Sequence, residues 1–293
     1  MITLEEHIKE VEPGLKKIIM DIAEKSKIIR TGFPTKRGKA GSENVYGEEQ
    51  AEMDKWADEL LVDNLKEIDS VASISSEERP DLIEADPNGR YSVMMDPLDG
   101  SSLLDIDLTV GTIIGIHKGK DPYRKGTDLA CAMYVLYGPM NYLVYTVGEG
   151  VHSFILGKTE EYLLLEENME IPEGKIYSPG GKRGDWTEKH RRYIRELEGN
   201  GYKLRYSGCF AADAHQILHK GGVFTYPALE DKPEGKLRLL FEAVPMGYLV
   251  QQAGGRVSNG EEDILEIVPH RLDIRVPIYI GGKKEIEMIE EMD

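Results

Sequence analysis

The sequence predicts an α/β protein with two sheet-containing domains that share a cleft. Apolar residues at helical spacing predict a long helix over 15–29, and a sheet-rich segment follows over 71–156. Beyond residue 175, short apolar segments alternate with helical ones. We therefore expect an N-terminal domain over 1–165 and a C-terminal substrate-binding domain over 166–293.

Two helices with a loop between them are predicted before the first strand. The first runs from Leu15 to Ile29, and a Gly/Lys/Ser-rich stretch from Thr31 to Asn44 predicts a mobile loop. The second helix carries Glu48 and Asp54 among its polar positions. Its apolar face is formed by Met53, Trp56, Ala57, Leu60 and Leu61.

The strands of the N-terminal domain are predicted from β-branched and alternating segments. They are expected over 71–75, 91–95, 109–117, 130–137, 141–147 and 151–156, with a hairpin turn at Gly148-Glu149-Gly150. In the C-terminal domain, strands are expected over 175–178, 222–226 and 277–280. Helices are expected over 187–197, 211–219 and 239–253, and from residue 283 onward.

The bulk composition excludes several classes of partner. Lys plus Arg number 36 and Asp plus Glu 53, so the net charge is −17, which repels nucleic acid and anionic membranes. Two cysteines, Cys131 and Cys209, cannot form a disulfide framework. Without an apolar run of roughly 18–20 residues or a signal peptide at the start, we expect a cytoplasmic protein.

The segment Asp96-Pro97-Leu98-Asp99-Gly100-Ser101 is the strongest candidate for a functional motif. An apolar strand delivers Asp96 at its end, Pro97 fixes a turn, and Asp99 then lies close to Asp96. Gly100 and Ser101 offer backbone N–H groups to phosphate oxygens, while the carboxylates suit hard cations. The same letters also fit an ordinary acidic turn between strands, and that alternative stays open for the segment alone.

Further carboxylates favour a metal-assisted reaction, although each has a simpler explanation. Glu77 and Glu78 end the preceding strand and could be a solvated charge run. Asp54 could be a surface acid of its helix. Glu242 lies in an apolar run, where a carboxylate is costly unless an Arg, a Lys or a metal ion pairs with it.

At this point the chain resembles the fructose-1,6-bisphosphatase class I family, within the lithium-sensitive, magnesium-dependent sugar phosphatases. The resemblance rests on Asp54, the Glu77-Glu78 pair and the string DPLDGSSLLDIDLTVGTIIG from Asp96. It extends to GKLRLLFE from Gly235, with Pro245-Met246 following. Asn44-Val45-Tyr46-Gly47 and Gly221 to Pro227 are similar as well.

The resemblance implies a five-layered αβαβα fold and two or three Mg²⁺ per subunit, which Mn²⁺ can replace. It implies metal ligands at Glu77, Glu78, Asp96, Leu98 (through its carbonyl), Asp99 and Glu242. Glu48, Asp54 and Glu78 become the catalytic acids, with Glu48 and Asp54 orienting and deprotonating the attacking water. Substrate contacts are implied at Gly100, Ser101, Arg205, Tyr206, Gly208, Cys209, Phe210, Tyr226, Lys236 and Arg238.

The implied activity is hydrolysis of the 1-phosphate of fructose-1,6-bisphosphate, a step of gluconeogenesis, by a homodimer or homotetramer. Arg205 is implied to reach into the neighbouring subunit's site. The chain departs from the family where Gly180 and Arg183 replace an Asn and a Tyr at the distal phosphate, so Lys182 or Arg183 could substitute. The phosphate loop of AMP-inhibited members is also absent, although the pair Arg90-Tyr91 remains.

Other functions stay open on the sequence alone. The departure at the distal phosphate makes sedoheptulose-1,7-bisphosphate a second candidate substrate. An enzyme acting on inositol phosphates or 3′-phosphoadenosine nucleotides would share the carboxylates but would need neither Lys236 nor Arg205. A non-enzymatic acidic protein that binds divalent cations for structure is the remaining alternative.

Overall fold

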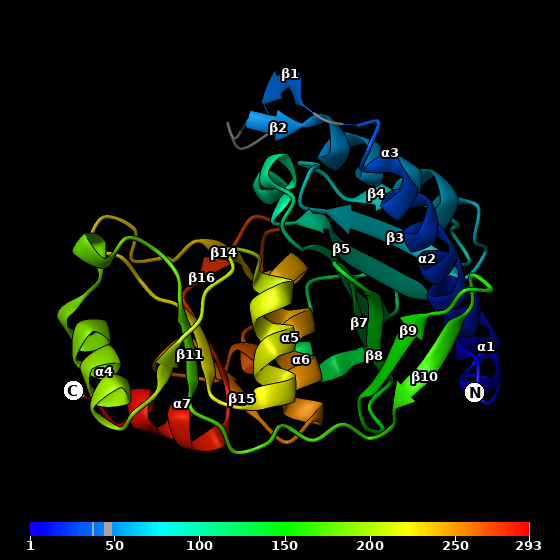
Figure 1. Ribbon diagram of the computed structural model, residues 1–293. Helices are drawn as coiled ribbons and strands as arrows, with labels where there is room; N and C mark the ends of the chain where they lie inside the picture. Colours follow the sequence, from blue (N-terminus) through cyan, green and yellow to red (C-terminus); the bar gives the residue numbers. More distant parts are fainter. Residues whose placement is uncertain (37, 44–48, 293) are drawn as a thin grey trace.

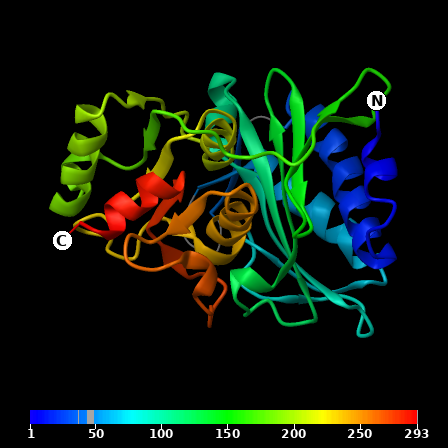
Figure 2. The ribbon, with the colours of Figure 1, turned by 90° about the horizontal axis from the view of Figure 1, so that it is seen from below.

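The protein, as a computed structural model that describes residues 1–36, 38–43 and 49–292, alternates layers of helix and sheet. Figure 1 shows α4 and α7 outermost, then a small sheet, then α5 and α6, then a large sheet, with α2 and α3 covering its far face. The view from below shows the same middle layer of helices between the two sheets (Figure 2). This is the αβαβα order that we predicted.

The helical elements differ from the predicted ranges mainly at their ends. Among the described residues, no helix is both long and apolar enough to span a membrane. The α-helices are α1 (Leu4–His7), α2 (Pro13–Gly32), α3 (Glu52–Lys66), α4 (Glu188–Gly199), α5 (Phe210–Lys220), α6 (Val244–Gln252) and α7 (Lys283–Glu290). The short helical turns are η1 (Ser101–Ile106), η2 (Gly126–Asp128), η3 (Arg183–Asp185), η4 (Leu239–Ala243) and η5 (Ile264–Glu266).

The large sheet is antiparallel apart from one parallel pair, β3 and β5, and has the order β10-β9-β8-β7-β6-β5-β3-β4. Its strands are β3 (Val71–Ser76), β4 (Ile83–Glu84), β5 (Tyr91–Asp99), β6 (Val110–Lys118), β7 (Leu129–Tyr137), β8 (Asn141–Thr146), β9 (His152–Leu156) and β10 (Tyr162–Glu166). Strands β8 and β9 pair as the predicted hairpin. Because β3 and β5 run parallel, their carboxyl ends lie at the same edge.

The small sheet has the order β12-β11-β13-β17-β15. Its strands are β11 (Ile176–Pro179), β12 (Lys203–Leu204), β13 (Val223–Tyr226), β15 (Arg256–Ser258) and β17 (Ile278–Gly281). Two further pairs stand outside the main sheets: β1 (Lys39–Glu43) with β2 (Glu49–Ala51), and β14 (Leu237–Arg238) with β16 (Arg275–Val276). The domain boundary near residue 165 stays a prediction, because the core around α5 and α6 draws on both halves of the chain.

Three hydrophobic clusters hold the layers together. One lies between the large sheet and α2 and α3 and includes the buried Ile18, Ile22 and Leu61. A second surrounds α5 and α6 and reaches both sheets, and a third seals α4 and α7 against the small sheet. The helical spacing of the buried residues in α2 is the pattern that predicted this helix.

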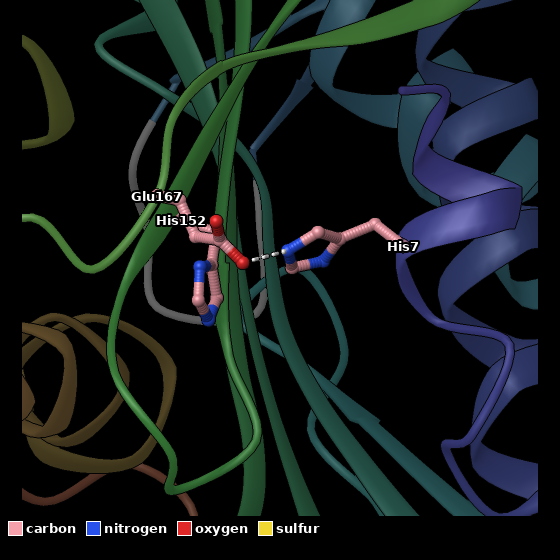
Figure 3. A group of neighbouring side chains, drawn as sticks. All are labelled: His7, His152 and Glu167. Atoms are coloured by element: carbon pink, nitrogen blue, oxygen red, sulfur yellow. Dashed lines mark hydrogen bonds and ion pairs between the residues drawn. The ribbon is translucent and has the colours of Figure 1, made fainter.

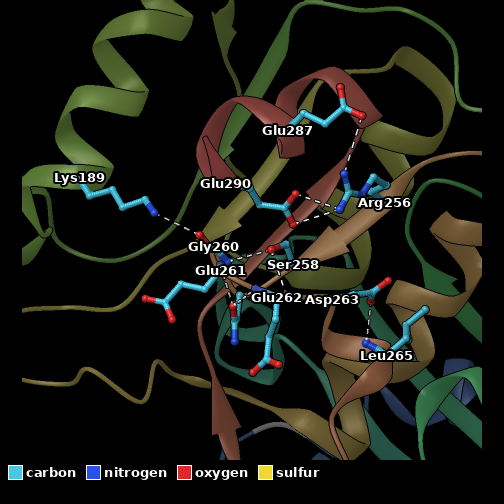
Figure 4. A network of polar contacts seen from close by, with 11 residues as sticks. Lys189, Arg256, Ser258, Gly260, Glu261, Glu262, Asp263, Leu265, Glu287 and Glu290 are labelled. Carbon is cyan, nitrogen blue, oxygen red and sulfur yellow. Dashed lines mark hydrogen bonds and ion pairs between the residues drawn. The ribbon is translucent and has the colours of Figure 1, made fainter. Parts of the chain in front are cut away.

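Polar contacts also hold the corner where β15, α4 and α7 meet (Figure 4). Arg256 of β15 pairs with Glu290 of α7 at 2.9 Å, and Lys189 of α4 donates to the Gly260 carbonyl at 3.2 Å. These exposed or half-exposed contacts contribute less than the buried cluster beneath them. They connect the outer helices to the edge of the small sheet.

The structure corrects three of the predicted elements. Part of the stretch predicted as a loop forms strand β1, because Lys39–Glu43 pairs with Glu49–Ala51. The helix expected over 239–253 begins as a π-helical turn, η4, and becomes α-helical only at Val244. Strand β5 continues through Asp99, so Asp96 lies within a strand rather than at its end.

Candidate active site

A cavity of about 260 Å³ opens where the carboxyl ends of β3 and β5 meet the start of α5. The predicted residues that line it are Asp54, Glu77, Glu78, Asp96, Leu98, Asp99, Gly100, Ser101, Tyr206, Gly208, Phe210, Tyr226, Lys236 and Glu242. These residues come from widely separated parts of the chain. The cavity therefore brings most of the predicted site together.

A bulge in β5 aims Asp96 and Asp99 at the cavity. Asp96 pairs with Ile113 and Asp99 with Gly111 across β6, so β5 has an extra residue between these two pairs. Pro97 has no N–H to donate to a sheet ladder, which explains the irregularity at this position. The bulge is fastened by the Leu98 N–H, which donates to Asp96 Oδ1 at 3.0 Å, and by the Thr112 hydroxyl, which donates to the Pro97 carbonyl at 2.8 Å.

Asp99 is held at the N-terminus of α5. Its Oδ2 accepts the Ala211 N–H at 2.6 Å and the Cys209 thiol at 3.0 Å. Donation from a helix N-terminus stabilises a carboxylate, whereas burial opposes its charge. Burial is the larger influence here and raises the pKa of Asp99 above its ordinary value.

Glu242 reaches the cavity from the π-helical turn η4. Its Oε2 accepts the Arg238 N–H at 2.5 Å, which fixes the carboxylate over the start of the turn. Arg238 is 2% exposed, and its Nε lies 3.4 Å from Glu77 Oε1. π-Helical turns inside helices often occur at functional sites, because the wider turn changes the direction of a side chain.

Three of the acids form a compact anionic group. One carboxylate oxygen from each of Glu77, Asp96 and Glu242 lies within 4.8 Å of the others. Burial, and then the charge of Glu77, raises the pKa of both Asp96 and Glu242 well above the ordinary values. Such clustered, oxygen-only donors are the ligand set that hard divalent cations prefer.

The two further acids, Glu78 and Asp54, line the same cavity. Asp54 is buried in the first turn of α3, and the Glu78 N–H donates to Ser76 Oγ at 3.3 Å. Glu77 and Glu78 thus both line one cavity, just beyond the end of β3. Glu48 lies outside the described residues.

Two residues that the sequence analysis missed support this turn. Asp58, 4% exposed on α3, accepts a hydrogen bond from Arg79 Nε at 2.7 Å. Arg79 directly follows the Glu77-Glu78 pair, so this bond holds the loop that carries both acids. The sequence does indicate Asp58, because this acid lies four residues after Asp54 and therefore on the same face of the helix.

Gly100 and Ser101 begin the short helix η1 at the edge of the cavity. Gly100 has φ +80°, and a Cβ there would lie 2.8 Å from the Cys209 Cβ. Both constraints require glycine at this position. The N–H groups that start η1 are therefore available at the same cavity as the carboxylates.

Another part of the cavity lining is aromatic and basic. Lys236 Nζ lies 5.5 Å from the centre of the Tyr226 ring, a cation–π distance. Gly180 makes room for this ring, because a Cβ there would approach Tyr226 Cδ2 to 2.3 Å. Tyr206 and Gly208 line the cavity nearby, and burial raises the pKa of Tyr206 to about 12.

Several predicted residues lie elsewhere. Cys209 is fully buried behind Asp99, and Arg238 is buried behind Glu77, so neither is among the described residues that line the cavity. Arg205 is exposed and donates to Gln216 Oε1 at 3.2 Å. Lys182 and Arg183 are also exposed and outside the described lining.

Arg275 is a cavity residue that the sequence analysis missed. Strand β16 pairs Arg275 with Arg238 of β14, and Arg275 Nη1 donates to the Lys236 carbonyl at 2.9 Å. This places a further cation at the cavity, beside Lys236. No sequence pattern identified it, because the β14–β16 pair joins residues that are far apart in the chain.

Comparisons with known proteins agree with the chemistry of this cavity. Family models described as the N-terminal and C-terminal domains of fructose-1-6-bisphosphatase match residues 2–167 and 171–293. The chain is 49% identical over 292 residues to the class 1 fructose-1,6-bisphosphatase of Methanocorpusculum labreanum, a match that covers 99% of this chain and 91% of that protein. It is 46% identical over 292 residues to the class 1 protein of Pelobacter propionicus, covering 97% of this chain and 90% of that one.

A solved structure extends the agreement to the whole fold. The crystal structure of Leishmania major fructose-1,6-bisphosphatase in holo form matches with a TM-score of 0.92 and 32% sequence identity, over 98% of this chain and 97% of that chain. The same enzyme in the T-state matches with a TM-score of 0.88. Both halves of the chain, its fold and its relatives therefore agree: the chain belongs to the fructose-1,6-bisphosphatase class 1 family of phosphatases.

Proposed function

We propose that this protein hydrolyses the 1-phosphate of fructose-1,6-bisphosphate to give fructose-6-phosphate and phosphate. The observation that carries the proposal is the cavity itself, whose lining combines a carboxylate cluster with Tyr226, Lys236 and Arg275. A substrate with a phosphate at each end needs cationic groups at both ends, in a chain whose net charge is −17. The relatives named above favour the fructose substrate over the alternatives.

The carboxylates fit Mg²⁺, two or three ions per subunit, with Mn²⁺ as a substitute. We assign Glu77, Glu78, Asp96, Asp99, Glu242 and the Leu98 carbonyl as the ligands; all six residues line the cavity. When bound, Mg²⁺ supplies positive charge against the phosphate oxygens and lowers the pKa of water.

The remaining steps are assigned to this chain's own groups. Asp54, buried at the cavity, takes the proton of the attacking water. We assign Glu78, which lines the same cavity, and Glu48 to the same proton transfer. The N–H groups of Gly100 and Ser101 hold oxygens of the phosphate that leaves. Lys236 contacts the sugar hydroxyls, while Tyr206, Tyr226 and the backbone of Gly208 to Phe210 position the far end of the substrate.

The buried Arg238 is assigned an indirect part in phosphate binding. Its guanidinium lies against Glu77 and its N–H donates to Glu242, so it supports the acids that hold the cations. Arg275 lies on the cavity side of the same strand pair. We therefore assign direct contact with the phosphate to Arg275, while Arg238 acts through Glu77 and Glu242.

A phosphate-release assay tests this function. The panel contains the bisphosphates of fructose and sedoheptulose, an inositol phosphate and 3′-phosphoadenosine phosphate, each with Mg²⁺ and with EDTA. We expect fructose-1,6-bisphosphate to be the best substrate and EDTA to abolish activity. Asp54→Asn should lower kcat by roughly 10²-fold or more, as loss of a general base does, while the exposed Asp81→Asn serves as the matched control.

Each negative result has a distinct meaning. Activity that survives EDTA would exclude the metal assignment, and a better rate with another substrate would replace the fructose assignment. No phosphate release from any substrate, with metal binding intact, would leave the non-enzymatic cation-binding alternative.

We also propose that the protein is a homodimer or homotetramer in the cytoplasm, acting in gluconeogenesis. Tyr206 faces its own cavity, whereas the adjacent Arg205 is exposed and points its guanidinium to Gln216. An exposed Arg beside an anion-binding cavity is suited to a phosphate bound in a neighbouring copy. Both cysteines are free and buried, which agrees with a reducing compartment.

Mixing two defective variants tests the oligomer. Arg205→Ala and Asp99→Ala proteins should each be nearly inactive at low substrate, and hybrids should regain part of the activity if Arg205 acts across an interface. If the hybrids regain no activity, Arg205 does not contribute to the site of a neighbouring subunit.

A further inference from the structure

Two histidines and a glutamate converge at the edge of the large sheet, outside the cavity described above. His7 ends α1, His152 begins β9, and Glu167 follows directly after β10. One possible ligand atom from each residue lies within 4.8 Å of the other two. In Figure 3 the His7 imidazole points from its helix across to the Glu167 carboxylate, with the His152 ring beside it.

The hydrogen bonds on the far side of each ring determine which nitrogen is free to bind an ion. His152 Nε2 lies 3.1 Å from the Glu149 carbonyl, which can only accept, so Nε2 carries the proton and Nδ1 has the lone pair. This Nδ1 accepts a hydrogen bond from the Asn168 N–H at 3.3 Å, which a bound ion would replace. A histidine whose other nitrogen donates to a carbonyl is the usual arrangement of a metal ligand.

His7 has a matching arrangement. Its Nδ1 lies 2.6 Å from the Tyr145 hydroxyl, and its Nε2 faces Glu167 Oε1 at 3.4 Å. When Nδ1 donates to the hydroxyl, the Nε2 lone pair and the carboxylate are two electron-rich groups that face each other. A cation between them, whether a metal ion or a proton on the ring, removes this repulsion.

The two imidazoles are largely buried, whereas the carboxylate is accessible to an ion from solvent. The exposed fraction is 7% for His152 and 11% for the His7 side chain, while the Glu167 side chain is 56% exposed. Fixed imidazoles beneath an accessible carboxylate let an ion enter from solvent without opening the core.

We propose that His7, His152 and Glu167 bind one transition-metal ion of the Zn²⁺ type. Two imidazole nitrogens and one carboxylate oxygen select Zn²⁺, Co²⁺ or Ni²⁺, whereas the oxygen-only cluster of the cavity suits Mg²⁺ or Mn²⁺. The two sites are therefore chemically distinct.

The ion would fasten the N-terminal segment to the large sheet. That segment is already docked, because the Leu164 N–H donates to the Ile2 carbonyl at 2.8 Å and Thr3 bridges to Leu163. His7 and His152 are far apart in the chain, so a shared ion closes a long loop and restricts the unfolded chain. Binding should consequently raise the thermal stability of the protein.

Co²⁺ titration of the full chain tests the proposal. Excess Mg²⁺ first occupies the oxygen-only site, and Co²⁺ is then added at pH 7.5 while visible absorption is recorded. Co²⁺ bound by two imidazoles with four or five ligands absorbs far more strongly than six-coordinate Co²⁺ among oxygens. We expect one strongly absorbing ion per chain, displaced by Zn²⁺, together with a rise in Tm.

The variants distinguish this site from any other. His7→Gln and Glu167→Gln should abolish the absorption or weaken Co²⁺ binding at least tenfold, and Tyr145→Phe should weaken it by about tenfold through loss of the contact to Nδ1. His219→Gln is the matched control, because His219 and His215 form a second pair of neighbouring histidines, with ring centres 4.2 Å apart. Unchanged phosphatase activity in Mg²⁺ confirms that the variants are folded.

Two results would overturn the proposal. One is the absence of the strong absorption in the unmodified protein. The other is an absorption that persists in the His7→Gln, Glu167→Gln double variant. In either case His7, His152 and Glu167 do not form a site for a metal ion of this type.

Discussion

Replacing Asp96 by asparagine should stabilise the metal-free protein while it removes activity. Oxygens of Glu77, Asp96 and Glu242 lie within 4.8 Å of one another, and burial and mutual repulsion raise the pKa of Asp96. Two full charges at that distance repel by about 3 kcal/mol at an effective dielectric constant of about 20. The asparagine side chain would keep an Oδ1 that accepts the Leu98 N–H, so the bulge survives the substitution.

The expected gain is smaller than the two relieved repulsions, because a carboxyl with a raised pKa can take up a proton instead. We expect the free energy of unfolding in EDTA at pH 7.5 to rise by about 2 kcal/mol, measured by urea denaturation. With Mg²⁺ the order should reverse, since the unmodified protein gains binding energy that the variant lacks. Exposed Asp81→Asn is the control and should leave stability unchanged.

The direction in which stability changes with pH is an independent check on the repulsion within the carboxylate cluster. A carboxyl whose folded pKa is raised contributes stability below its unfolded pKa, and this is lost as the pH rises through the folded value. The metal-free protein should therefore lose stability as the pH rises above about 4, and Asp96→Asn should lose less. A variant that is no more stable than the unmodified protein in EDTA would show that the cluster stores no repulsion, and would refute the reasoning.

Two further predictions concern the distal end of the cavity and the outer helices. Gly180→Asn should raise KM for the bisphosphate roughly tenfold, because a Cβ would lie 2.3 Å from Tyr226 Cδ2 and moving the ring costs about 1–3 kcal/mol. The control is Gly184→Asn, where a Cβ meets nothing within 4 Å. Equal KM values for the two variants would remove Tyr226 from the substrate contacts. Burial lowers the pKa of His190 to about 3, so the neutral ring contributes fully to stability above about pH 6.5. This contribution decreases as the pH is lowered, and the loss reaches about 2 kcal/mol at pH 5. His190→Phe should show a correspondingly smaller loss between pH 7 and pH 5 in urea denaturation, and an identical pH dependence would contradict this origin.

The spacing of apolar residues predicted those helices and strands that pack against a single apolar surface. Helix α2 buries Ile18, Ile19 and Ile22 against the large sheet, so its apolar residues recur at helical spacing and the helix was located to within a few residues. Strands β6 and β7 are buried along nearly their whole length, and both were predicted to within a few residues. The layer order came from the family resemblance, since such patterns do not report which sheet a helix covers.

The elements that give the site its shape escaped prediction for a physical reason. The bulge at Pro97 and the π-helical turn η4 each depart from the regular period, and a pattern search sees only the regular part. Arg275 and the Asp58–Arg79 pair reach the site through contacts between distant segments. The carboxylates were predicted because a recognised motif carries them, whereas the groups that hold them are recognisable only in three dimensions.

Arg238 shows how such a supporting group makes a metal site compatible with folding. Glu77, Asp96 and Glu242 carry a formal charge of −3, and the buried Arg238 beside them adds +1, so −3 + 1 = −2. One divalent cation therefore neutralises this group, and further cations require the charges of Glu78 and Asp99. Without Arg238 the excess charge would be buried beside apolar residues, where an unpaired charge costs several kcal/mol. The arginine thus limits the repulsion that the metal-free protein must tolerate, and it leaves enough negative charge to attract the ions that an anionic substrate needs.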